Sequence, residues 1–521
     1  MEIINNRWTS TAASIWIQTT SGLSYTFGIY SSVLKSSQNY DQSTLDTVSV
    51  FKDIGANFGI LSGLIYASVA ARGRSGIAGP WSVHLAGAIQ CFIGYFLIWL
   101  SVIGVIDKPP LFAMCLFMLI AAHSQTFFNT ANVVTAVSNF PEYSGTIVGI
   151  MKGFLGLSGA VLIQAYRTFL PGNPSGFILM LALLPTIISI SLMFLIRIHP
   201  TTSAGIDKKY LNWFSYIALA VVTYLLILII LENFTTLSTL AHLITFTVLL
   251  LMLASLFLLA NRAHRGESSR LLESTTNQLI EENLDDKENS ISKDINLVQA
   301  MRTMNFWFLF VAMLCGMGSG LATINNISQI GESLNYRTVE INTLVSLWSI
   351  WNFLGRFGAG YISDMFLHSR GWARPIFMAG TLATMSVGHL IIASGFRGNL
   401  YVGSVLVGIC YGSQWSLMPT ITSELFGVLN MGTIFNTISI ASPVGSSILS
   451  VLVIGKIYDR EASSSGDGNS CFGTKCFMFS FFVLATVSFL GFLVALVLFF
   501  RTKRFYGELW LIRLRHSGRE S

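Results

Sequence analysis

Charged side chains are scarce in this sequence of 521 residues. Asp, Glu, Lys and Arg together make up 11% of the chain, whereas hydrophobic residues make up 52%. A soluble globular domain usually carries about 25% charged residues, so the composition excludes an ordinary soluble protein. The sequence also lacks the Gly-x-Ser-x-Gly, His-Glu-x-x-His and Gly-Lys-Ser/Thr motifs of hydrolases, zinc proteases and phosphate-driven pumps. We therefore expect no enzyme, no metal site and no cofactor.

In place of charged residues, the sequence contains long apolar segments. Each is close to or above the roughly 20 residues that a helix needs to cross the hydrocarbon core of a membrane. Within lipid, a spanning segment of this kind must be a helix, because the helix satisfies its own backbone polar groups. We expect an all-α polytopic membrane protein with fourteen transmembrane helices arranged six, two, six. The fourteen segments cover roughly residues 11–33, 44–69, 80–103, 111–137, 144–168, 175–197, 211–231, 238–260, 303–327, 339–362, 373–395, 399–422, 431–456 and 476–500.

These segments divide the chain into five parts. The one substantial polar stretch is rich in Asp, Glu, Ser, Thr and Asn, a composition that cannot bury a hydrophobic core. We interpret it as a tether between two bundles, with regulation through its serines or a partner motif as the alternative. The parts are an N-terminal six-helix bundle (1–200), two additional transmembrane helices (201–260), a disordered cytosolic loop (261–302), a C-terminal six-helix bundle (303–500) and a basic cytosolic tail (501–521).

Lys and Arg are distributed unequally between the two ends of the apolar segments. Of 31 such residues, 20 fall on one side, eight on the other and three inside segments. The positive-inside rule then places both termini in the cytosol, and an even number of crossings requires the same. We expect the first segment to be a retained signal anchor and the basic tail to contact anionic lipid rather than nucleic acid. The plasma membrane and an internal membrane fit equally, and the oligomeric state is left open.

Two of the six cysteines stand apart from the others. Cys471 and Cys476 lie in a polar loop before the last apolar segment, whereas the other four lie inside segments. A disulfide between them is one alternative, which requires that this loop faces an oxidising compartment. The other alternative is a pair of free thiols.

A weak internal repeat relates the two blocks of six segments. Gly-Thr-Ile occurs at residues 145–147 and again at 432–434, in each case at the start of the fifth segment of its block. Duplicated halves are typical of transporter folds.

The segment 355–364 reads Gly-Arg-Phe-Gly-Ala-Gly-Tyr-Ile-Ser-Asp and is followed by Arg370 and Arg374. It resembles the cytosolic motif of the major facilitator superfamily. The resemblance implies that the glycine lets two helices approach, and that the Asp and the basic residues form a latch which breaks as two halves rock. The corresponding loop of the first block keeps Arg72 and Arg74 but lacks the Asp. The implied gating residues are Gly355, Arg356, Gly360, Asp364 and Arg370.

More of the chain resembles the plant nodulin-like, nuclear-fusion-defective branch of that superfamily. The resemblance implies a membrane transporter fold with two extra helices between the halves, and it implies no particular solute. It is carried by residues 15–18 (Ile-Trp-Ile-Gln), 30–35, 139–142 (Asn-Phe-Pro-Glu), 149–160, 423–427 (Ser-Glu-Leu-Phe-Gly) and 471–476.

Charge inside an apolar segment is costly and marks candidate functional sites. The candidates are Lys52 and Asp53 in the second segment, His123 in the fourth and Lys152 in the fifth. Glycines recur every four residues beside both lysines, and small residues at this spacing let helices pack closely in lipid. Both lysines should therefore face protein or a water-filled cavity. For Lys52 and Asp53 the structural alternative is an internal ion pair or snorkelling to the exoplasmic rim, for His123 a packing role, and for Lys152 a bond to backbone carbonyls.

The sequence thus predicts a secondary active transporter for a small polar solute. The buried lysines and histidine outnumber the buried aspartate, which favours an organic anion moved with protons. One alternative is a carrier of a neutral solute, in which Lys52 and Asp53 form a structural pair. Another is a receptor or scaffold that transports nothing and signals through the loop at 261–302.

Overall fold

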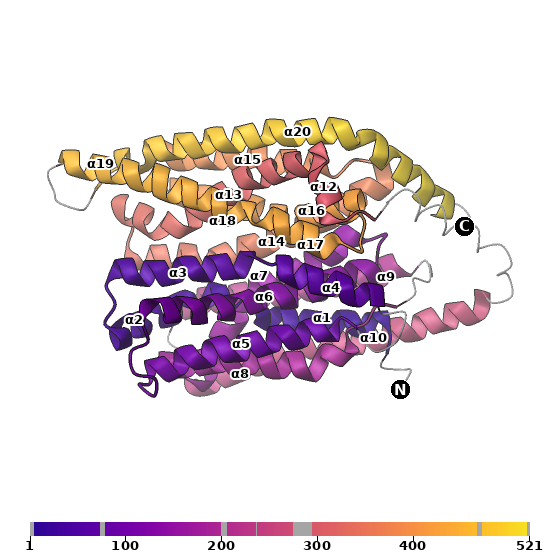
Figure 1. The fold of residues 1–521 in the computed structure, drawn as a ribbon, viewed down its shortest axis with the longest axis horizontal. Helices are drawn as coiled ribbons and strands as arrows, with labels where there is room; N and C mark the ends of the chain where they lie inside the picture. The colour runs from indigo at the N-terminus through magenta and orange to yellow at the C-terminus, as the bar shows by residue number, and fades with distance from the viewer. Residues whose placement is uncertain are drawn as a thin grey trace. The chain divides into compact units, whose positions relative to one another are not determined.

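The computed structural model of the chain describes residues 5–72, 79–199, 206–235, 237–274, 294–396, 398–465 and 471–517. Within these residues every regular element is a helix, as Figure 1 shows. The prediction of an all-α protein is therefore confirmed. The helices belong to two compact units.

The first unit consists of Met1–Leu225, Thr235–Asp294 and Phe426–Thr437. Its central helix is α7, in whose apolar stretch 94% of the residues are buried. This helix packs against α1, α6 and α10. α6 also packs against α3 and α5, and α5 packs against α8 (Figure 1). Its helices are α1 (Arg7–Ser21), the 3₁₀ helix η1 (Leu23–Thr26), α2 (Phe27–Gln38), α3 (Gln42–Asn57), α4 (Ile60–Arg72), α5 (Trp81–Val102), α6 (Leu111–Asn139), α7 (Ser144–Phe169), α8 (Pro174–Leu192), most of α9 (Asp207–Phe234) and α10 (Thr239–Ser274).

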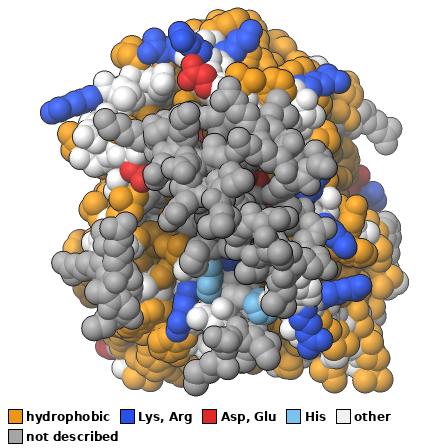
Figure 2. All heavy atoms as spheres, turned by 90° about the vertical axis from the view of Figure 1, so that its right-hand side faces the viewer, with side chains coloured by type: hydrophobic (Ala, Val, Ile, Leu, Met, Phe, Trp, Pro, Cys, Tyr) orange, Lys and Arg blue, Asp and Glu red, His pale blue; other side chains and the backbone are white. Residues whose placement is uncertain are grey.

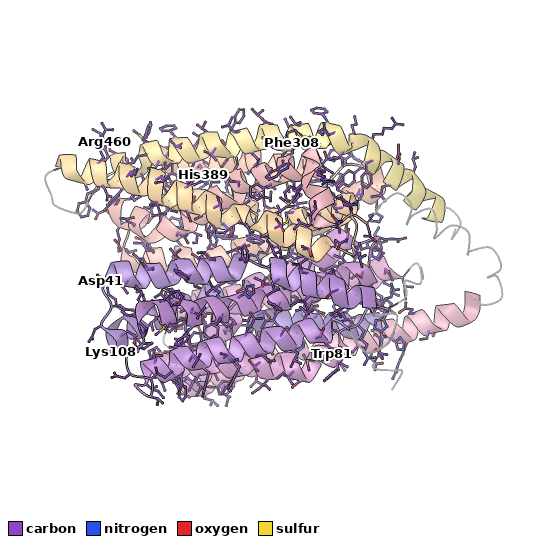
Figure 3. The ribbon with its side chains drawn as sticks, viewed as in Figure 1. Asp41, Trp81, Lys108, Phe308, His389 and Arg460 are labelled. Atoms are coloured by element: carbon purple, nitrogen blue, oxygen red, sulfur yellow. A yellow bond between two sulfur atoms is a disulfide. The ribbon has the colours of Figure 1, made fainter. Side chains whose placement is uncertain are left out.

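The second unit consists of Leu226–Phe234, Ile295–Leu425 and Ile438–Ser521. Here α13 packs against α14, α18 and α20, and α15 packs against α20. His389, labelled in Figure 3, lies along α15, and its ring nitrogens are 3.1 Å from Thr323 Oγ1 and 3.2 Å from Ser488 Oγ. The helices are α12 (Leu297–Met301), α13 (Met304–Ser333), α14 (Thr338–Arg370), α15 (Pro375–Ser394), α16 (Asn399–Phe426), α18 (Ala441–Ser447), the π-helix η5 (Ile448–Gly455), α19 (Lys456–Ser465) and α20 (Lys475–Ser517), while α17 (Met431–Ser439) joins the two units.

Eleven helices of the described chain are long and apolar enough to cross a membrane. The protein is therefore a multi-pass membrane protein, but the predicted count of fourteen and the six-two-six arrangement are not confirmed. The three predicted crossings outside this set correspond to α1 with α2, to α14 and to α16. α1 and the second half of α16 are almost wholly buried and rich in Ser and Thr. A helix that faces protein rather than lipid has no need of an apolar surface, which explains their low hydropathy.

Two of the predicted crossings are interrupted. The first stops at Gly22, because α1 passes so close to α7 that a Cβ on this glycine would lie 1.8 Å from Ser158 Oγ. The second is divided at Phe58 and Gly59, which leaves the Phe58 carbonyl outside the regular hydrogen bonds of α3. Interrupted helices expose backbone groups, and membrane proteins tolerate them where protein or a water-filled cavity surrounds the break.

Two helices continue beyond the apolar runs that predicted them. α10 extends to Ser274, so residues 261–274 of the predicted disordered loop are helical instead. The physical reason is that Ala263 and Glu267 are buried against the first unit, which supplies contacts that composition does not reveal. Residues 275–293 of that predicted loop lie outside the described residues. α20 likewise extends to Ser517, through most of the predicted tail at 501–521.

The repeat and the cysteine pair have clear structural counterparts. The two Gly-Thr-Ile triplets each begin one residue after the start of a helix, α7 in one case and α17 in the other. In the second unit the structure joins Cys471 to Cys476 in a disulfide at the start of α20. The other four cysteines are buried free thiols.

Candidate transport site and latch

Lys152 is a cation in the interior of the first unit. It is 1% exposed and lies eight residues after the start of α7, which at 1.5 Å per residue is about 12 Å along the helix. Its Nζ lies 5.0 Å from the centre of the Phe435 ring, a cation–π contact from the segment 426–437. The structure thus places Lys152 within protein, as the glycine spacing predicts.

Amide side chains lie at a similar depth on α1 and α6, two of the helices that pack against α7. Gln18 of α1 and Asn129 of α6 are both buried, and Gln18 Nε2 is 3.5 Å from Asn129 Oδ1. On the same helix Gln125 Oε1 accepts a 2.9 Å hydrogen bond from Ser24 Oγ. Counted from the helix starts or ends, Gln18 and Asn129 are about 16 and 15 Å along their helices. This level of the unit can therefore offer both a cation and several amides to a polar solute.

Lys52 and Asp53 form an ion pair on α3. Lys52 Nζ is 3.1 Å from Asp53 Oδ1, and the same ammonium lies 4.9 Å from the centre of the Phe27 ring. The Lys52 side chain is 12% exposed and that of Asp53 is 33% exposed. This geometry matches the structural alternative that the sequence left open, and it neutralises one of the two predicted lysines.

His123 of α6 connects three elements. Its Nδ1 is 2.8 Å from Gln90 Oε1 on α5, and its Nε2 is 3.0 Å from the Phe58 carbonyl at the break between α3 and α4. A carbonyl only accepts, so Nε2 must carry a proton. A neutral ring then accepts at Nδ1 from the Gln90 amide in its rotated orientation, whereas an imidazolium donates to Gln90 Oε1. Proton uptake at His123 would thus reverse the direction of one hydrogen bond.

The glycines of the second predicted crossing make close contacts, as their spacing predicts. A Cβ on Gly55 would lie 2.5 Å from the Leu119 carbonyl of α6, and one on Gly63 would lie 2.4 Å from the Thr433 nitrogen. Between these levels Asn436 Nδ2 donates to Thr130 Oγ1 at 2.8 Å, and Thr130 in turn bonds Ser62 at 2.8 Å. The segment 426–437 is therefore held to α4 and α6 by close backbone contact and by buried hydrogen bonds.

The predicted motif of the second unit forms a buried ion cluster. Arg374 Nη2 is 2.5 Å from Asp364 Oδ1, and Arg374 Nε is 2.8 Å from each Glu424 carboxylate oxygen. The side chains of these three residues, which we call the latch, are 0%, 4% and 6% exposed. Arg374 Nη1 also donates to Ser363 Oγ at 2.7 Å. One guanidinium thus joins the end of α14, the start of α15 and the end of α16.

The other predicted gating residues have separate positions. Arg370 is exposed and lies over the rings of Phe366 and Trp372, so Asp364 is paired with Arg374 rather than with Arg370. The remaining three lie within α14 and make other contacts. Gly355 lets α14 cross α16, because a Cβ there would lie 2.0 Å from the Ile409 carbonyl. Arg356 Nε donates to Asn352 Oδ1 at 2.7 Å, and the Gly360 carbonyl accepts from Ser363 Oγ at 3.0 Å.

Sequence reasoning missed two features. The first is Glu424, which lies 50 residues from Arg374 along the chain and enters the sequence analysis only as part of a family resemblance. The second is an ion cluster in the first unit, where Arg7 is 2.6 Å from Asp207 and 2.7 Å from Glu267. Trp8 Nε1 donates to the same Glu267 at 2.8 Å. Nothing in the sequence links residues so far apart along the chain.

The first-unit ion cluster ties α1, α9 and the extension of α10 together. The nearby His199 is partly buried, and its backbone N–H donates to Asn139 Oδ1 at 2.9 Å. Burial lowers the pKa of His199 below its ordinary value, and the neighbouring Arg197 lowers it further.

Arg72 and Arg74, the first-block counterparts of the motif, have no described side chains. Within the described chain, no group of three or more His, Cys, Asp or Glu side chains could hold a metal ion.

Two family models match most of the chain. The model described as Nodulin-like matches residues 7–259, and the model described as NFD4, C-terminal domain, matches residues 288–508. The protein NUCLEAR FUSION DEFECTIVE 4 of Arabidopsis thaliana is 27% identical to this chain, over 96% of this chain and 90% of the relative. A protein of Emericella nidulans, named a probable transporter mch1, is 26% identical over 33% of this chain and 34% of the relative.

Solved structures share the fold. The proton:xylose symporter XylE, a major facilitator, matches with a TM-score of 0.56 and 11% identity, over 94% of this chain and 94% of XylE. A bacterial homologue of the iron transporter ferroportin in its outward-facing state matches with a TM-score of 0.56 and 12% identity, over 95% and 99% of the two chains. The fungal relative is named a probable transporter, and the solved structures that share the fold are of a symporter and of a homologue of a transporter. The chain is thus similar to the nodulin-like proteins along its first half and to the NFD4 C-terminal domain along its second half, and it has the fold of solved membrane transporters.

Proposed function

We propose that this protein moves a small organic anion across a membrane by alternating access, with protons as the coupling ion. The observation that carries the proposal is Lys152, a cation 1% exposed within the central helix of the first unit. A charge held within a membrane bundle is costly and is retained where it has a role. The amides of Gln18 and Asn129 lie at a similar depth and supply the uncharged contacts that orient a carboxylate.

The proposed topology has fourteen crossings in a six-two-six arrangement with both termini in the cytosol. It adds α1 with α2, α14 and α16 to the eleven apolar helices. α1 and the second half of α16 are almost wholly buried, and a helix that faces protein has no need of an apolar surface. The cytosolic side is the one that carries the end of α20, where Arg501, Lys503 and Arg504 are exposed. Figure 2 shows one face of the molecule, on which Lys and Arg are more frequent than Asp and Glu among the described side chains.

Two groups have roles in the conformational cycle. The latch of Asp364, Arg374 and Glu424 stabilises one arrangement of α14, α15 and α16, and its opening accompanies the change to the other. His123 is the proton-binding group, because its two ring nitrogens contact α5 and the break between α3 and α4. Gating through Gly355, Arg356, Gly360 and Arg370 belongs to the same proposal, with Arg370 as its outermost member.

A neutral solute is the second candidate, and one observation favours it. Lys52 is neutralised by Asp53 at 3.1 Å, so the interior is less positive than residue counting implies. Uptake of labelled carboxylates and of labelled neutral sugars into proteoliposomes separates the two. The proposal predicts carboxylate uptake that Lys152→Ala reduces, whereas uptake of neutral sugars alone would establish the alternative.

A different experiment tests the alternative of a scaffold that transports nothing. Residues 275–293 can be replaced by a Gly-Ser linker of the same length, which keeps Glu267 and Asp294 in their described contacts. A carrier should retain uptake after this replacement. A scaffold that signals through these residues should lose its function and show no uptake in either form.

A further inference from the structure

The extension of α20 past its apolar run has one face turned to the protein. Thr502, Tyr506 and Leu509 are buried, at spacings of four and three residues, whereas Lys503, Arg504 and Glu508 between them are exposed. This is the pattern of an amphipathic helix that packs on protein. The extension therefore does more than offer its basic residues to lipid.

Its buried face packs on the turn between α14 and α15. Tyr506 and Leu509 form a hydrophobic cluster with Leu367 at the end of α14 and Ala373 just before α15, and Leu425 packs against this cluster. Leu425 follows directly after Glu424 of the latch. The extension thus contacts both chain segments that bring the latch residues together.

Trp510 fixes the turn itself. Its Nε1 donates to the His368 carbonyl at 3.1 Å, which satisfies a carbonyl near the end of α14. Its ring lies against Gly371, where a Cβ would be 2.9 Å from the ring. Gly371 has a φ of +66°, a conformation that glycine adopts without strain, so the turn and the ring fit together only with glycine here.

The turn so fixed presents Arg374 to both of its carboxylates. Arg374 is the residue before α15, three positions after Gly371, and it is 0% exposed. A shift of this turn would move Arg374 away from Asp364 or Glu424, because a guanidinium can bridge two carboxylates only in a restricted geometry.

We infer that the extension of α20 is a positioning element of the latch, in which Tyr506 and Trp510 hold the α14–α15 turn so that Arg374 reaches Asp364 and Glu424 together. Its influence on transport rests on the proposed function, but its influence on the latch does not. Trp510 and Tyr506 are positioning residues, since they act through Arg374.

Hydrogen exchange of the purified full-length protein in lipid nanodiscs tests this without any solute. Exchange is followed in residues 365–375 and in residues 421–426. Trp510→Ala should raise exchange in both segments by about fivefold or more, the size expected for loss of one hydrogen bond and its packing. Trp510→Phe keeps the ring against Gly371 and should raise it less. Leu511→Ala, at an exposed neighbouring position, is the matched control and should leave exchange unchanged.

A double variant distinguishes an effect of the α20 extension through the latch from a general effect on the stability of the protein. If the extension acts through the latch, Trp510→Ala should add little at residues 421–426 once Asp364→Asn has opened it, because effects within one network are not additive. Full additivity, or no change at 421–426 in Trp510→Ala, would overturn the inference. Where Trp510→Ala does not fold, the same comparison with Trp510→Phe decides. Failure to find any transported solute would count against the proposed function and leave this result intact.

Discussion

Lys152 is the residue on which the choice of solute depends. It is 1% exposed, it contacts the Phe435 ring, and it lies on the helix that the first unit surrounds. The other predicted lysine, Lys52, already has a carboxylate partner. The sequence leaves an ion pair with Asp53 open for Lys52 and a bond to backbone carbonyls open for Lys152, and the structure contains the ion pair.

Replacing Lys152 should therefore affect transport more than stability. We expect Lys152→Ala to reduce anion uptake by about tenfold or more, the size of about 1.4 kcal/mol of lost interaction. Lys152→Arg, which keeps the charge, should retain part of it. Lys208→Ala, at an exposed position, is the control. Unchanged uptake by Lys152→Ala in proteoliposomes would remove Lys152 from the site.

His123 is the proposed proton site, because protonation would reverse the hydrogen bond between its Nδ1 and Gln90. We expect His123→Gln to flatten the dependence of uptake on pH, and Gln90→Leu to shift it, because Gln90 contacts Nδ1. Initial uptake rates at a series of pH values measure this. An unaltered pH profile in both variants would assign His123 to packing.

Two arginines that are close together in the sequence differ in their burial and in their partners. Arg374 is 0% exposed and bridges two carboxylates, whereas Arg370 lies on the surface. We expect Arg374→Ala to destabilise the protein by about 3–5 kcal/mol, because it leaves two buried carboxylates without their cation. Arg370→Ala should have little effect. Thermal unfolding in detergent compares them, and equal losses would contradict the role assigned to Arg374.

At the scale of elements, close helix crossings depend on particular glycines. Gly355 and Gly358 lie on the same helix, but only Gly355 has a neighbouring backbone within reach of a Cβ. Gly355→Ala should destabilise the protein by about 1–3 kcal/mol through overpacking at α16. Gly358→Ala meets open space and should be neutral or slightly stabilising, since alanine favours helix. Thermal unfolding that ranks the two variants the other way would refute this view of the crossing.

Much of the element pattern could be predicted from the sequence, because lipid requires long apolar helices. The exceptions have physical causes. α1 and the second half of α16 are polar and buried in protein, so hydropathy understates them. The extension of α10 is stabilised by Arg7 and Trp8, more than 250 residues away along the chain, and composition alone predicts disorder there. The family resemblance singled out Arg370 as the basic gating residue, whereas the structure pairs Asp364 with Arg374, which also follows Asp364 closely in the sequence.

At the scale of the whole molecule, the fold is that of solved membrane transporters, and the named residues make the proposed mechanism testable. Gln18, Asn129 and Lys152 form the candidate solute site, His123 the proposed proton site, and Asp364, Arg374 and Glu424 the latch. The three groups share no residue, so each can be altered without removing the others.

The most direct test of the central claim is accumulation of labelled small carboxylates in proteoliposomes with and without an imposed proton gradient. We predict that carboxylates accumulate above the outside concentration only when the gradient is present, and that this accumulation is lost in Lys152→Ala. Folded protein that moves carboxylates at the same rate with and without the gradient, or moves none of them, would contradict it.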